Sequence, residues 1–432
     1  MKDGYDRYVT LLNQSQHFPA ARLKALQMRG LNRFLQHARD QVPAYRRRLS
    51  PLFESSVDLD FSRWEEVPVL TRTDVQRESR DLRAASVPPQ SGATQTQHTS
   101  GSTGTPLIHH RSQLQHAANQ AVLDRLYNWH NIDGNKGLAV LATAYKDPAP
   151  YPHGSAANQW RHGYEDGQSF QLDIMTATTE QQLEWLCRQD VSYLTTAPNN
   201  ARALIETAAE SGQALPPLQT IMLSGEVLEA ETRELIAQAF GCTVINLYGA
   251  SESGRLATTC PEHDGLHLHE EISFVEVVDE QGRALPAGQT GRILTTSFYN
   301  FAMPLIRYAL GDFGAISEAP CPCGRSSRTL KFVAGRQRNL FRFIDGTTKW
   351  PDMKMKDLRS IYPFRQMQVV QDQIDHLTVH MVESIAGGEI DHSALQAVFR
   401  KSLHPSLSIT IQLCDEISRT PGGKFEDFVS KI

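Results

Sequence analysis

The segment Thr99-Ser100-Gly101-Ser102-Thr103-Gly104-Thr105-Pro106 is the strongest local signal in this sequence. Its two glycines let the backbone approach a ligand closely, and its hydroxyl groups and consecutive amides can donate hydrogen bonds to a phosphate. The segment is not a Walker P-loop, which requires a Gly-Lys pair at a fixed spacing. A flexible linker without a ligand is the alternative for such a stretch taken alone.

The chain around this segment is expected to form an α/β fold. Ser, Thr, Gly, Pro and Gln dominate residues 85–106, which predicts a loop, whereas the leucines and aromatics of residues 20–48 recur at helical spacing. From residue 113 to 245, apolar stretches typical of buried strands alternate with helical patterns, which indicates a sheet with ligand loops at its strand ends. The predicted strands are 138–141, 193–195, 220–224 and 243–247, and the predicted helices are 179–187 and 230–240.

The rest of the chain predicts a different organisation. Strands at 273–278 and 291–296 flank a turn at 279–282, which favours an antiparallel, barrel-like section. Beyond a boundary near residue 335, strands at 367–370, 376–381 and 408–413 and a helix at 393–402 predict a small α+β domain. We therefore expect a large domain over residues 1–335, built of stacked α/β sheets and the barrel-like section, and a small mobile domain over residues 336–432.

A second polar segment, Asn246-Leu247-Tyr248-Gly249-Ala250-Ser251-Glu252-Ser253, follows a predicted strand. It is expected at the edge of the sheet, where ligands bind in folds of this class. A tyrosine can stack on a base there, and a carboxylate can hold a Mg²⁺ ion that bridges phosphates. Taken alone, the segment also fits a strand-ending turn with a solvated glutamate.

Three further segments place a polar side chain next to glycine. Asp312 follows Gly311 and can accept two ribose hydroxyls, and the guanidinium of Arg336 can meet ribose or phosphate. Lys424 lies on the Gly-rich segment 419–424 near the C-terminus, although a lone lysine in such a place is usually a solvated surface residue.

In this order, the five segments resemble the adenylate-forming superfamily of acyl-CoA synthetases, peptide-synthetase adenylation domains and luciferases. The resemblance runs from about residue 60 to the end of the chain and is closest to the phenylacetate–CoA ligase branch. Marks of that branch are residues 303–308, Met-Pro-Leu-Ile-Arg-Tyr, before the Gly-Asp pair, residues 321–325, Cys-Pro-Cys-Gly-Arg, and the short chain. The resemblance implies an enzyme that uses ATP to activate a carboxylic acid as an acyl-adenylate and passes the acyl group to a thiol.

The resemblance also implies roles for individual residues. Glu252 would hold Mg²⁺, and Lys424 would reach the carboxylate oxygen and the α-phosphate; these two are the expected catalytic residues. Tyr145 and Tyr193 are expected to line the acid pocket from their places beside predicted strands, and Tyr145 fits a core or lid position equally well. The residues expected to contact ATP are Thr99, Ser100, Gly101, Ser102, Thr103, Gly104, Ser224, Gly225, Glu226, Asn246, Tyr248, Gly249, Ser251, Asp312 and Arg336.

The sequence departs from the family pattern in three places. The phosphate loop lacks the basic residue that many relatives carry, since Leu107 follows Pro106. At the hinge after Gly335-Arg336, Gln337-Arg338-Asn339 replaces the usual pair of aspartates. Residues 345–351 replace the glycine-rich segment that contacts the pantetheine thiol region in the branch. These changes leave the acceptor and the second half-reaction as the open part of the assignment.

Three cysteines and one histidine predict a structural zinc site. Cys260 and His267 precede the barrel-like section, and Cys321 and Cys323 follow it, so a tetrahedral Zn²⁺ would join its two ends. His263 and His269 are rival ligands, and His269 also fits a place near the active site. Three thiols without a metal are the alternative.

Composition limits the remaining possibilities. A net charge of -5 argues against a general nucleic-acid binder. The polar N-terminus shows no secretory signal, and no run approaches the roughly 18 apolar residues of a membrane span, so the cytoplasm is the expected location. The expected cofactors are ATP, Mg²⁺ and Zn²⁺, and the expected partners are a small carboxylic acid, aryl by resemblance, and CoA or a carrier protein. A homodimer, an amine acceptor and a silent nucleotide-binding scaffold stay open as alternatives.

Overall fold

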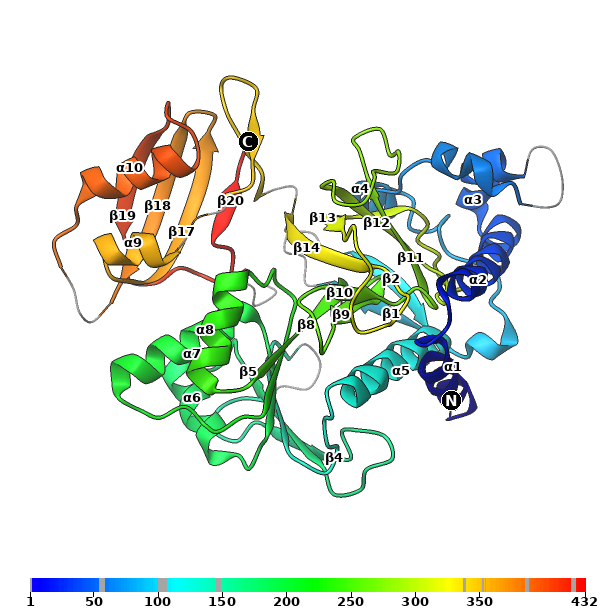
Figure 1. Ribbon diagram of the computed structural model, residues 1–432, viewed down its shortest axis with the longest axis horizontal. Coiled ribbons are helices and arrows are strands. Elements are labelled where there is room, and N and C mark those ends of the chain that lie inside the picture. Colours follow the sequence, from blue (N-terminus) through cyan, green and yellow to red (C-terminus); the bar gives the residue numbers. More distant parts are fainter. Residues whose placement is uncertain are drawn as a thin grey trace. The chain divides into compact units, whose positions relative to one another are not determined.

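The computed structural model describes residues 2–53, 59–99, 107–144, 149–336, 339–351, 353, 355–384, 388–420 and 425–432. The chain divides into two compact units, both of mixed α/β structure (Figure 1). Unit 1 comprises Met1–Gly134, Arg161–Tyr164 and Ile245–Val333; unit 2 comprises Asn135–Trp160, Glu165–Val244 and Ala334–Ile432. The expected α/β fold class is confirmed.

Unit 1 begins with helices, and proline separates two of them. Pro43 lacks an N–H and disfavours a helical Val42, which adopts φ -117° and ψ 113°. The helical pattern predicted over residues 20–48 is therefore two helices. The helices of unit 1 are α1 (Lys2–Ser15), α2 (Ala20–Gln41), α3 (Pro43–Arg48), α4 (Arg72–Arg77) and α5 (Gln113–Trp129), with 3-10 helices η1 (Ser50–Leu52), η2 (Phe61–Glu66) and η3 (Pro89–Ser91).

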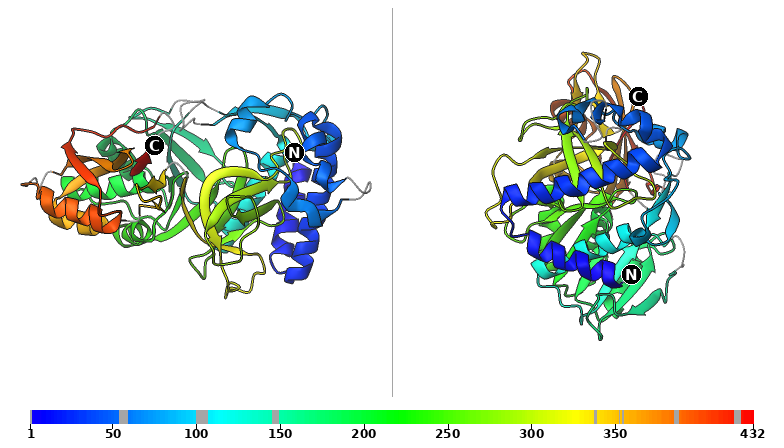
Figure 2. Two further views of the ribbon diagram at one scale, coloured as in Figure 1. Left: turned by 90° about the horizontal axis from the view of Figure 1, so that it is seen from above. Right: turned by 90° about the vertical axis from the view of Figure 1, so that its right-hand side faces the viewer.

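One hydrophobic cluster joins these helices to the segment before β13. Leu12 of α1, Phe34 of α2 and Val122 of α5 are buried together with Phe298 and Ile306. In Figure 2 the dark blue helices α1 and α2 lie together at one side of unit 1. The burial of apolar side chains from both ends of unit 1 holds its discontinuous segments in one body.

The antiparallel section predicted for unit 1 is confirmed, and its strands form an open run in the order β11-β12-β13-β14-β10-β9-β8. Strand β11 covers the predicted residues 273–278 and pairs with β12 from Ser273–Ser297 to Val278–Arg292. The strands are β8 (Thr243–Ala250), β9 (Gly254–Thr259), β10 (Leu266–Leu268), β11 (Ser273–Val278), β12 (Gly291–Ser297), β13 (Tyr308–Ile316) and β14 (Thr329–Arg336).

The loop predicted over residues 85–106 is wrong in one part. Strand β1 (Thr94–His98) pairs antiparallel with β2 (Ile108–Ser112), from Thr94–Ser112 to His98–Ile108. The sequence Thr-Gln-Thr-Gln-His has no apolar face, so the period-2 pattern of a strand is absent from it. The hairpin places the two ends of the candidate phosphate loop, Thr99 and Leu107, beside each other.

The middle section of unit 2 is a mostly parallel sheet in the order β7-β6-β3-β5-β4. Its core contains Leu141, Trp185, Leu194, Leu204 and Ile221, which come from alternating strands and helices as predicted. The elements are β3 (Leu138–Ala142), β4 (Ser155–Asn158), β5 (Gln168–Asp173), α6 (Thr179–Arg188), β6 (Tyr193–Thr196), α7 (Pro198–Ser211), β7 (Thr220–Ser224) and α8 (Ala230–Phe240).

The C-terminal section has a sheet and a core of its own. Strands β19-β18-β17-β20 form the sheet, and Leu358 of α9 and Phe399 of α10 pack on Val369 and Leu377. The predicted boundary at residue 335 lies within β14, and the division into two compact units groups this section with the middle of the chain, so the two predicted domains stay a prediction. The elements are β15 (Phe341–Arg342), β16 (Thr348–Lys349), α9 (Met355–Ile361), β17 (Phe364–Gln373), β18 (His376–Glu383), α10 (His392–Ser402), β19 (Ser408–Leu413) and β20 (Phe428–Ser430).

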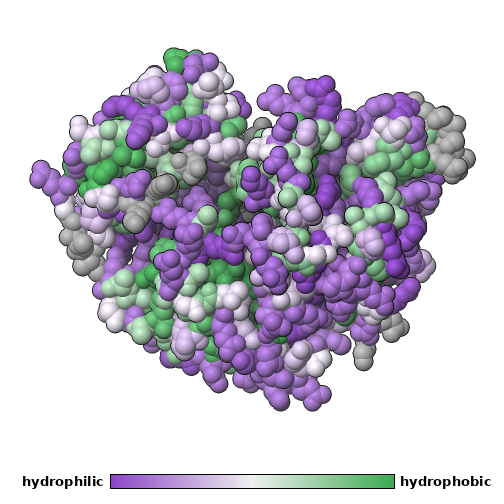
Figure 3. Space-filling view, viewed as in Figure 1, coloured by the Kyte–Doolittle hydropathy of each residue, from purple (hydrophilic) through white to green (hydrophobic). Residues whose placement is uncertain are grey.

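Among the described residues, no helix has the length and apolar character needed to cross a membrane. On the face drawn in Figure 3, apolar side chains are interspersed with hydrophilic ones.

A buried arginine ties the early part of unit 1 to its strands. Arg307 has φ 49° and no exposed surface, and its guanidinium lies 3.1 Å from the carboxylate of Glu276. It also donates to the backbone carbonyls of Glu65 at 3.0 Å and Val67 at 2.9 Å and to that of Gly282. One side chain thus satisfies several buried or partly buried acceptors.

We expect Arg307→Met to lower the free energy of unfolding by about 3–5 kcal/mol, because Glu276 and several carbonyls would stay buried without their cation. The matched control is Arg283→Met, whose exposed pair with Asp279 should contribute less than about 1 kcal/mol. Urea unfolding of both variants measures the difference, and equal losses would contradict the structural role of Arg307.

Candidate active site

A tight turn between β8 and β9 carries Glu252. Ser297 Oγ donates to the carbonyl of Ser253 at 2.6 Å, and Asn119 Oδ1 accepts the backbone N–H of Arg255 at 2.8 Å. Helix α5 and strand β12 therefore hold the turn from two sides, and Glu252 itself is only 8% exposed.

The glycines of this turn are required by close backbone approach. A Cβ on Gly249 would lie 2.3 Å from the carbonyl oxygen of Gly254. Gly254 has φ 79°, which side chains rarely adopt, and a Cβ there would lie 2.5 Å from Asn119. The Gly249 position that the sequence marked as a ligand contact thus has a structural reason of its own.

Glu252 is paired with a buried tyrosine. The hydroxyl of Tyr308 donates to Glu252 Oε1 at 3.0 Å, and Tyr308 is 1% exposed. Burial, and next the charge of Glu252, raise the pKa of Tyr308, so the phenol stays protonated and keeps donating. Tyr308 belongs to the segment that marks the resembling branch, but no role was predicted for it from the sequence.

A second tyrosine–carboxylate pair also includes a residue of β13. Tyr248 of β8 donates its hydroxyl to Asp312 Oδ2 of β13 at 3.0 Å. The structure therefore brings together the two residues that were expected near adenine and ribose. The pair fixes the Asp312 carboxylate at the end of a half-buried ring.

The rest of the expected segment 246–253 surrounds these pairs. Asn246 donates its backbone N–H to Thr259 Oγ1 at 2.8 Å across the β8–β9 ladder. Ser251 is exposed, and its hydroxyl lies 3.3 Å from Nε2 of the buried His109 on β2. The β1–β2 hairpin thus contacts the Glu252 turn, a juxtaposition that sequence spacing did not indicate.

Thr99 and Leu107, the described residues at the two ends of the candidate phosphate loop, are hydrogen-bonded to each other. The backbone N–H of Thr99 donates to the carbonyl of Leu107 at 3.0 Å, and its Oγ1 accepts the N–H of Leu107 at 2.9 Å. Oγ1 also accepts a hydrogen bond from Arg72 Nη2 at 3.1 Å. Ser100, Gly101, Ser102, Thr103 and Gly104 lie outside the described residues.

Three expected contacts belong to unit 2. Ser224 ends β7, and Gly225 follows with φ 91°. Glu226 accepts the backbone N–H groups of Asn199 at 3.1 Å and Phe425 at 3.0 Å. Burial raises the pKa of Glu226, and the two N–H groups oppose this by stabilising the carboxylate.

The structure says little about four other residues that were expected in the site. Tyr145 and Lys424 lie outside the described residues, and Arg336 ends β14. Tyr193 is 1% exposed, and its ring packs edge-on against Trp160 with centroids 6.0 Å apart. This burial favours a core role, so the place of Tyr193 in the acid pocket stays a prediction.

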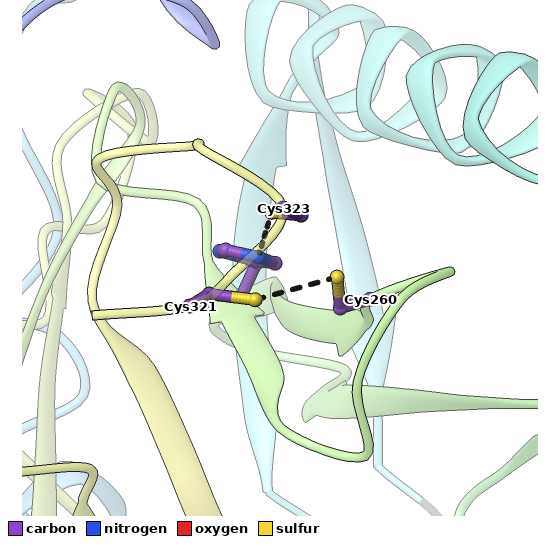
Figure 4. Close-up of side chains that lie close together, drawn as sticks. Cys260, Cys321 and Cys323 are labelled. Atoms are coloured by element: carbon purple, nitrogen blue, oxygen red, sulfur yellow. Dashed lines mark hydrogen bonds between the residues drawn. The ribbon is translucent and has the colours of Figure 1, made fainter. Parts of the chain in front are cut away.

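The four residues predicted to bind metal lie together. One donor atom from each of Cys260, His267, Cys321 and Cys323 lies within 4.8 Å of every other. Cys321 Sγ is 3.6 Å from Cys260 Sγ, and Cys323 Sγ is 3.2 Å from His267 Nε2 (Figure 4). Tetrahedral zinc with Zn–S about 2.3 Å would separate its ligands by about 3.8 Å, so the cluster has the right size.

The surroundings of the cluster favour the same four ligands. His267 Nδ1 lies 2.9 Å from Ser327 Oγ, which orients the ring and leaves Nε2 toward the cysteines. The rival His263 uses Nδ1 to accept the N–H of Gly265 at 2.8 Å. The other rival, His269, lies 2.6 Å from Arg125 Nη2 in a buried polar cluster.

Comparisons with known proteins identify relatives of this chain. Residues 40–302 match the family model described as AMP-binding enzyme. Phenylacetate-coenzyme A ligase of Thermus thermophilus is 25% identical over 350 residues, which are 77% of this chain and 74% of that protein. The enzyme of the same name from Escherichia coli is 23% identical over 423 residues, which are 93% of each chain.

Solved structures share the fold. 2-Hydroxyisobutyryl-CoA ligase, bound to 2-HIB-AMP in the postadenylation state, superposes with a TM-score of 0.74 at 20% identity and covers 97% of this chain and 92% of its own. The amide bond synthetase McbA of Marinactinospora thermotolerans has a TM-score of 0.51 at 17% identity, with 80% and 71% covered. At these identities the likeness concerns the fold alone.

We expect the free energy of unfolding to decrease as the pH is lowered, because of the titration of His109. Burial, aided by Arg111, lowers the pKa of His109 to about 4 from its ordinary 6.5. Between these values the unfolded chain binds the extra proton, so stability is full above pH 6.5 and declines as the pH falls toward 4.

Between pH 7 and pH 5, the free energy of unfolding of the His109→Gln variant should decrease by about 2 kcal/mol less than that of the parent protein. This follows from about 1.4 kcal/mol per pH unit below 6.5. Urea unfolding at both pH values is the measurement, and His153→Asn, at an exposed position, is the control. A parallel decline of parent and His109→Gln would contradict the assignment.

Proposed function

The chain belongs to the AMP-binding enzyme family, and from that membership we propose its reaction. It is an adenylate-forming enzyme of the phenylacetate–CoA ligase-like branch. It uses ATP to activate a carboxylic acid as an acyl-adenylate with release of pyrophosphate. The acyl group then passes to the thiol of coenzyme A, and AMP leaves.

The observation that carries the proposal is the pair of tyrosine–carboxylate contacts in unit 1. Tyr308 holds Glu252, and Tyr248 holds Asp312, with both pairs joined through β13. A nucleotide needs one carboxylate at its ribose and one at the metal on its phosphates. The two pairs supply carboxylates whose orientation is fixed before any ligand arrives, which saves ordering cost on binding.

Asp312 is the proposed ribose ligand. A carboxylate oxygen accepts hydrogen bonds from ribose hydroxyls, and the bond from Tyr248 to Oδ2 keeps the group from rotating. The ring of Tyr248 lies half-buried beside this carboxylate, so it is the proposed stacking surface for the base.

Glu252 is the proposed magnesium ligand, and its chemistry fits because Mg²⁺ prefers carboxylate oxygens. The bond from Tyr308 uses Oε1, so Oε2 is the oxygen that can face the metal. Bound Mg²⁺ neutralises charge on the phosphates of ATP. The buried Tyr308 keeps Glu252 in one orientation for this task.

The first half-reaction joins two anions, since a carboxylate attacks the α-phosphate. Positive charge must offset this repulsion in the transition state. Lys424 is proposed to supply it from the C-terminal section. Phe425, the first described residue after Lys424, donates its backbone N–H to Glu226 of unit 2.

The acceptor and the acid are the less constrained parts of the proposal. Coenzyme A is proposed as the acceptor because the relatives covering most of the chain are named for it. Phenylacetate, the acid in the name of these relatives, supports an aryl acid, with Tyr145 and Tyr193 kept as proposed pocket residues. An amine or a carrier-protein thiol would be the outcome if coenzyme A fails as acceptor.

ATP–pyrophosphate exchange with a panel of aryl and aliphatic acids tests the activation step, and acyl-CoA formation tests the transfer step. Acid-dependent exchange is the expected result, and Lys424→Ala should abolish it. A purified, folded protein that shows no exchange with any acid would favour the silent scaffold instead.

We expect Glu252→Gln to raise the Mg²⁺ concentration needed for half-maximal exchange, because an amide oxygen is a poorer ligand for a hard cation. Exchange rates at fixed ATP over a Mg²⁺ series measure this, and the exposed Glu280→Gln serves as control. An unchanged Mg²⁺ dependence would remove Glu252 from the metal site.

We also propose that Cys260, His267, Cys321 and Cys323 bind a structural zinc ion. Four protein ligands complete a tetrahedral site and leave no position for substrate or water. The ion would join the β9–β10 turn to the segment before β14.

The protein purified without added metal should therefore contain about one equivalent of zinc. Cys321→Ser should lose the zinc and melt at a lower temperature, while the exposed Cys187→Ser should keep both properties. Elemental analysis below about half an equivalent, with unchanged melting of Cys321→Ser, would exclude the site.

A further inference from the structure

The phosphate loop carries no cation of its own. Residues 99–107 read Thr-Ser-Gly-Ser-Thr-Gly-Thr-Pro-Leu and contain neither lysine nor arginine. A loop that binds the polyphosphate of ATP is aided by positive charge close to it, because charge-assisted hydrogen bonds to phosphate are about twice as strong as neutral ones. The structure offers a candidate from a different part of the chain.

We infer that Arg72 binds the β- and γ-phosphates of ATP and stays with the departing pyrophosphate. The inference rests on the proposed function and adds a substrate-contacting residue to it. Arg72 donates from Nη2 to Thr99 Oγ1 at 3.1 Å, and Thr99 is the residue that closes the base of the loop on Leu107. The guanidinium therefore lies beside Thr99, the described residue at the N-terminal end of this segment.

The fold holds Arg72 beside the proposed metal ligand as well. Leu70 bridges to Tyr308: its N–H donates to the carbonyl of Arg307 at 3.0 Å, and its carbonyl accepts the N–H of Ala309 at 2.9 Å. Two residues later, Arg72 begins α4, which packs beside β13 (Figure 1). Tyr308 is the residue whose hydroxyl holds Glu252.

The local helix keeps the arginine in place. Thr71 caps α4 in a capping box with Asp74, whose N–H donates to Thr71 Oγ1 at 3.1 Å. The Asp74 carboxylate also accepts a hydrogen bond from Arg77 at 2.6 Å, so this carboxylate interacts with Thr71 and Arg77. Arg72, the first residue of the helix, extends its side chain toward Thr99.

Electrostatics at the Tyr308 hydroxyl report the same proximity. Burial and Glu252 raise the pKa of this phenol, and Arg72 opposes them both by its charge and by a hydrogen bond. Arg72 thus lies between the loop base and the Tyr308–Glu252 pair. A Mg²⁺ ion on Glu252 and a guanidinium at Thr99 would meet the same phosphate chain.

The chemistry suits arginine. Its guanidinium stays charged at every working pH and has five N–H donors in a plane, so it can hold Thr99 and a phosphate oxygen together. In adenylation a carboxylate oxygen bonds to the α-phosphorus, and the bond to the bridging oxygen breaks. The electron pair leaves with pyrophosphate, whose growing negative charge Arg72 would stabilise.

Other cations near the loop are less well placed. Arg77 pairs with Asp74 and Glu78 and is 64% exposed on the far part of the helix. Burial lowers the pKa values of His109 and His110, which favours their neutral forms. Arg111 on β2 is the rival, although burial lowers its pKa.

The test separates the two half-reactions. Arg72→Gln should raise KM for ATP and for pyrophosphate in the exchange assay by about 10- to 100-fold, as expected for a lost charged hydrogen bond. Arg72→Lys should recover part of the loss. Transfer of the acyl group from added acyl-adenylate to coenzyme A should stay unchanged, because that step involves no β- or γ-phosphate.

Arg77→Gln on the same helix and Arg111→Gln on β2 are the comparison variants, with thermal melting measured for all. The inference is overturned if Arg72→Gln keeps both KM values within about twofold, if the loss follows Arg111 instead, or if KM for coenzyme A rises instead. A fall in both half-reactions together with lower melting would also overturn it, since that pattern belongs to a structural role. Exchange activity of the parent protein tests the proposed reaction separately from Arg72.

Discussion

The buried guanidinium of Arg307 is the contact on which the arrangement of unit 1 depends. It joins carbonyls before α4 to Glu276 on β11 and to the turn at Gly282, across more than two hundred residues of sequence. Leu70, which follows these carbonyls in the chain, and Tyr308, which follows Arg307, then lie beside each other in a hydrogen-bonded β-bridge. The phenol that orients Glu252 and the helix that presents Arg72 therefore share one buried anchor.

Much of the fold could be predicted because local pattern and buried environment agree. Strand β11 follows the residues predicted from its mostly apolar and β-branched sequence, and α6 and α8 follow their helical periodicity. Strand β1 could not be predicted, since its polar, exposed residues carry no signal and only pairing with β2 makes them a strand. The helix break at Pro43 was visible in the sequence but was outweighed by the periodicity around it.

The candidate site shows where sequence reasoning ends. Glu252 was predicted from its segment after a predicted strand and Asp312 from its place beside a glycine, and the cysteine and histidine spacing predicted a cluster that the structure brings together. Their tyrosine partners were not predicted, because Tyr308 and Tyr248 lie 56 and 64 residues from the carboxylates they bind. Such pairs depend on strand order, and the contact between Arg72 and Thr99 depends on the β1–β2 hairpin in the same way.

The presence of Tyr308 and Asp312 on a single strand has a consequence for how the chain can vary. Four residues of backbone separate them, with Gly311 at φ 86°, so they lie no more than about 13 Å apart, and the spacing between the two carboxylates depends on this length of chain. An insertion among the exposed residues 212–214, outside β13, would leave that spacing intact. An insertion between residues 308 and 312 would shift one carboxylate contact against the other, so sequence length should be conserved within β13 even where its side chains are exchanged.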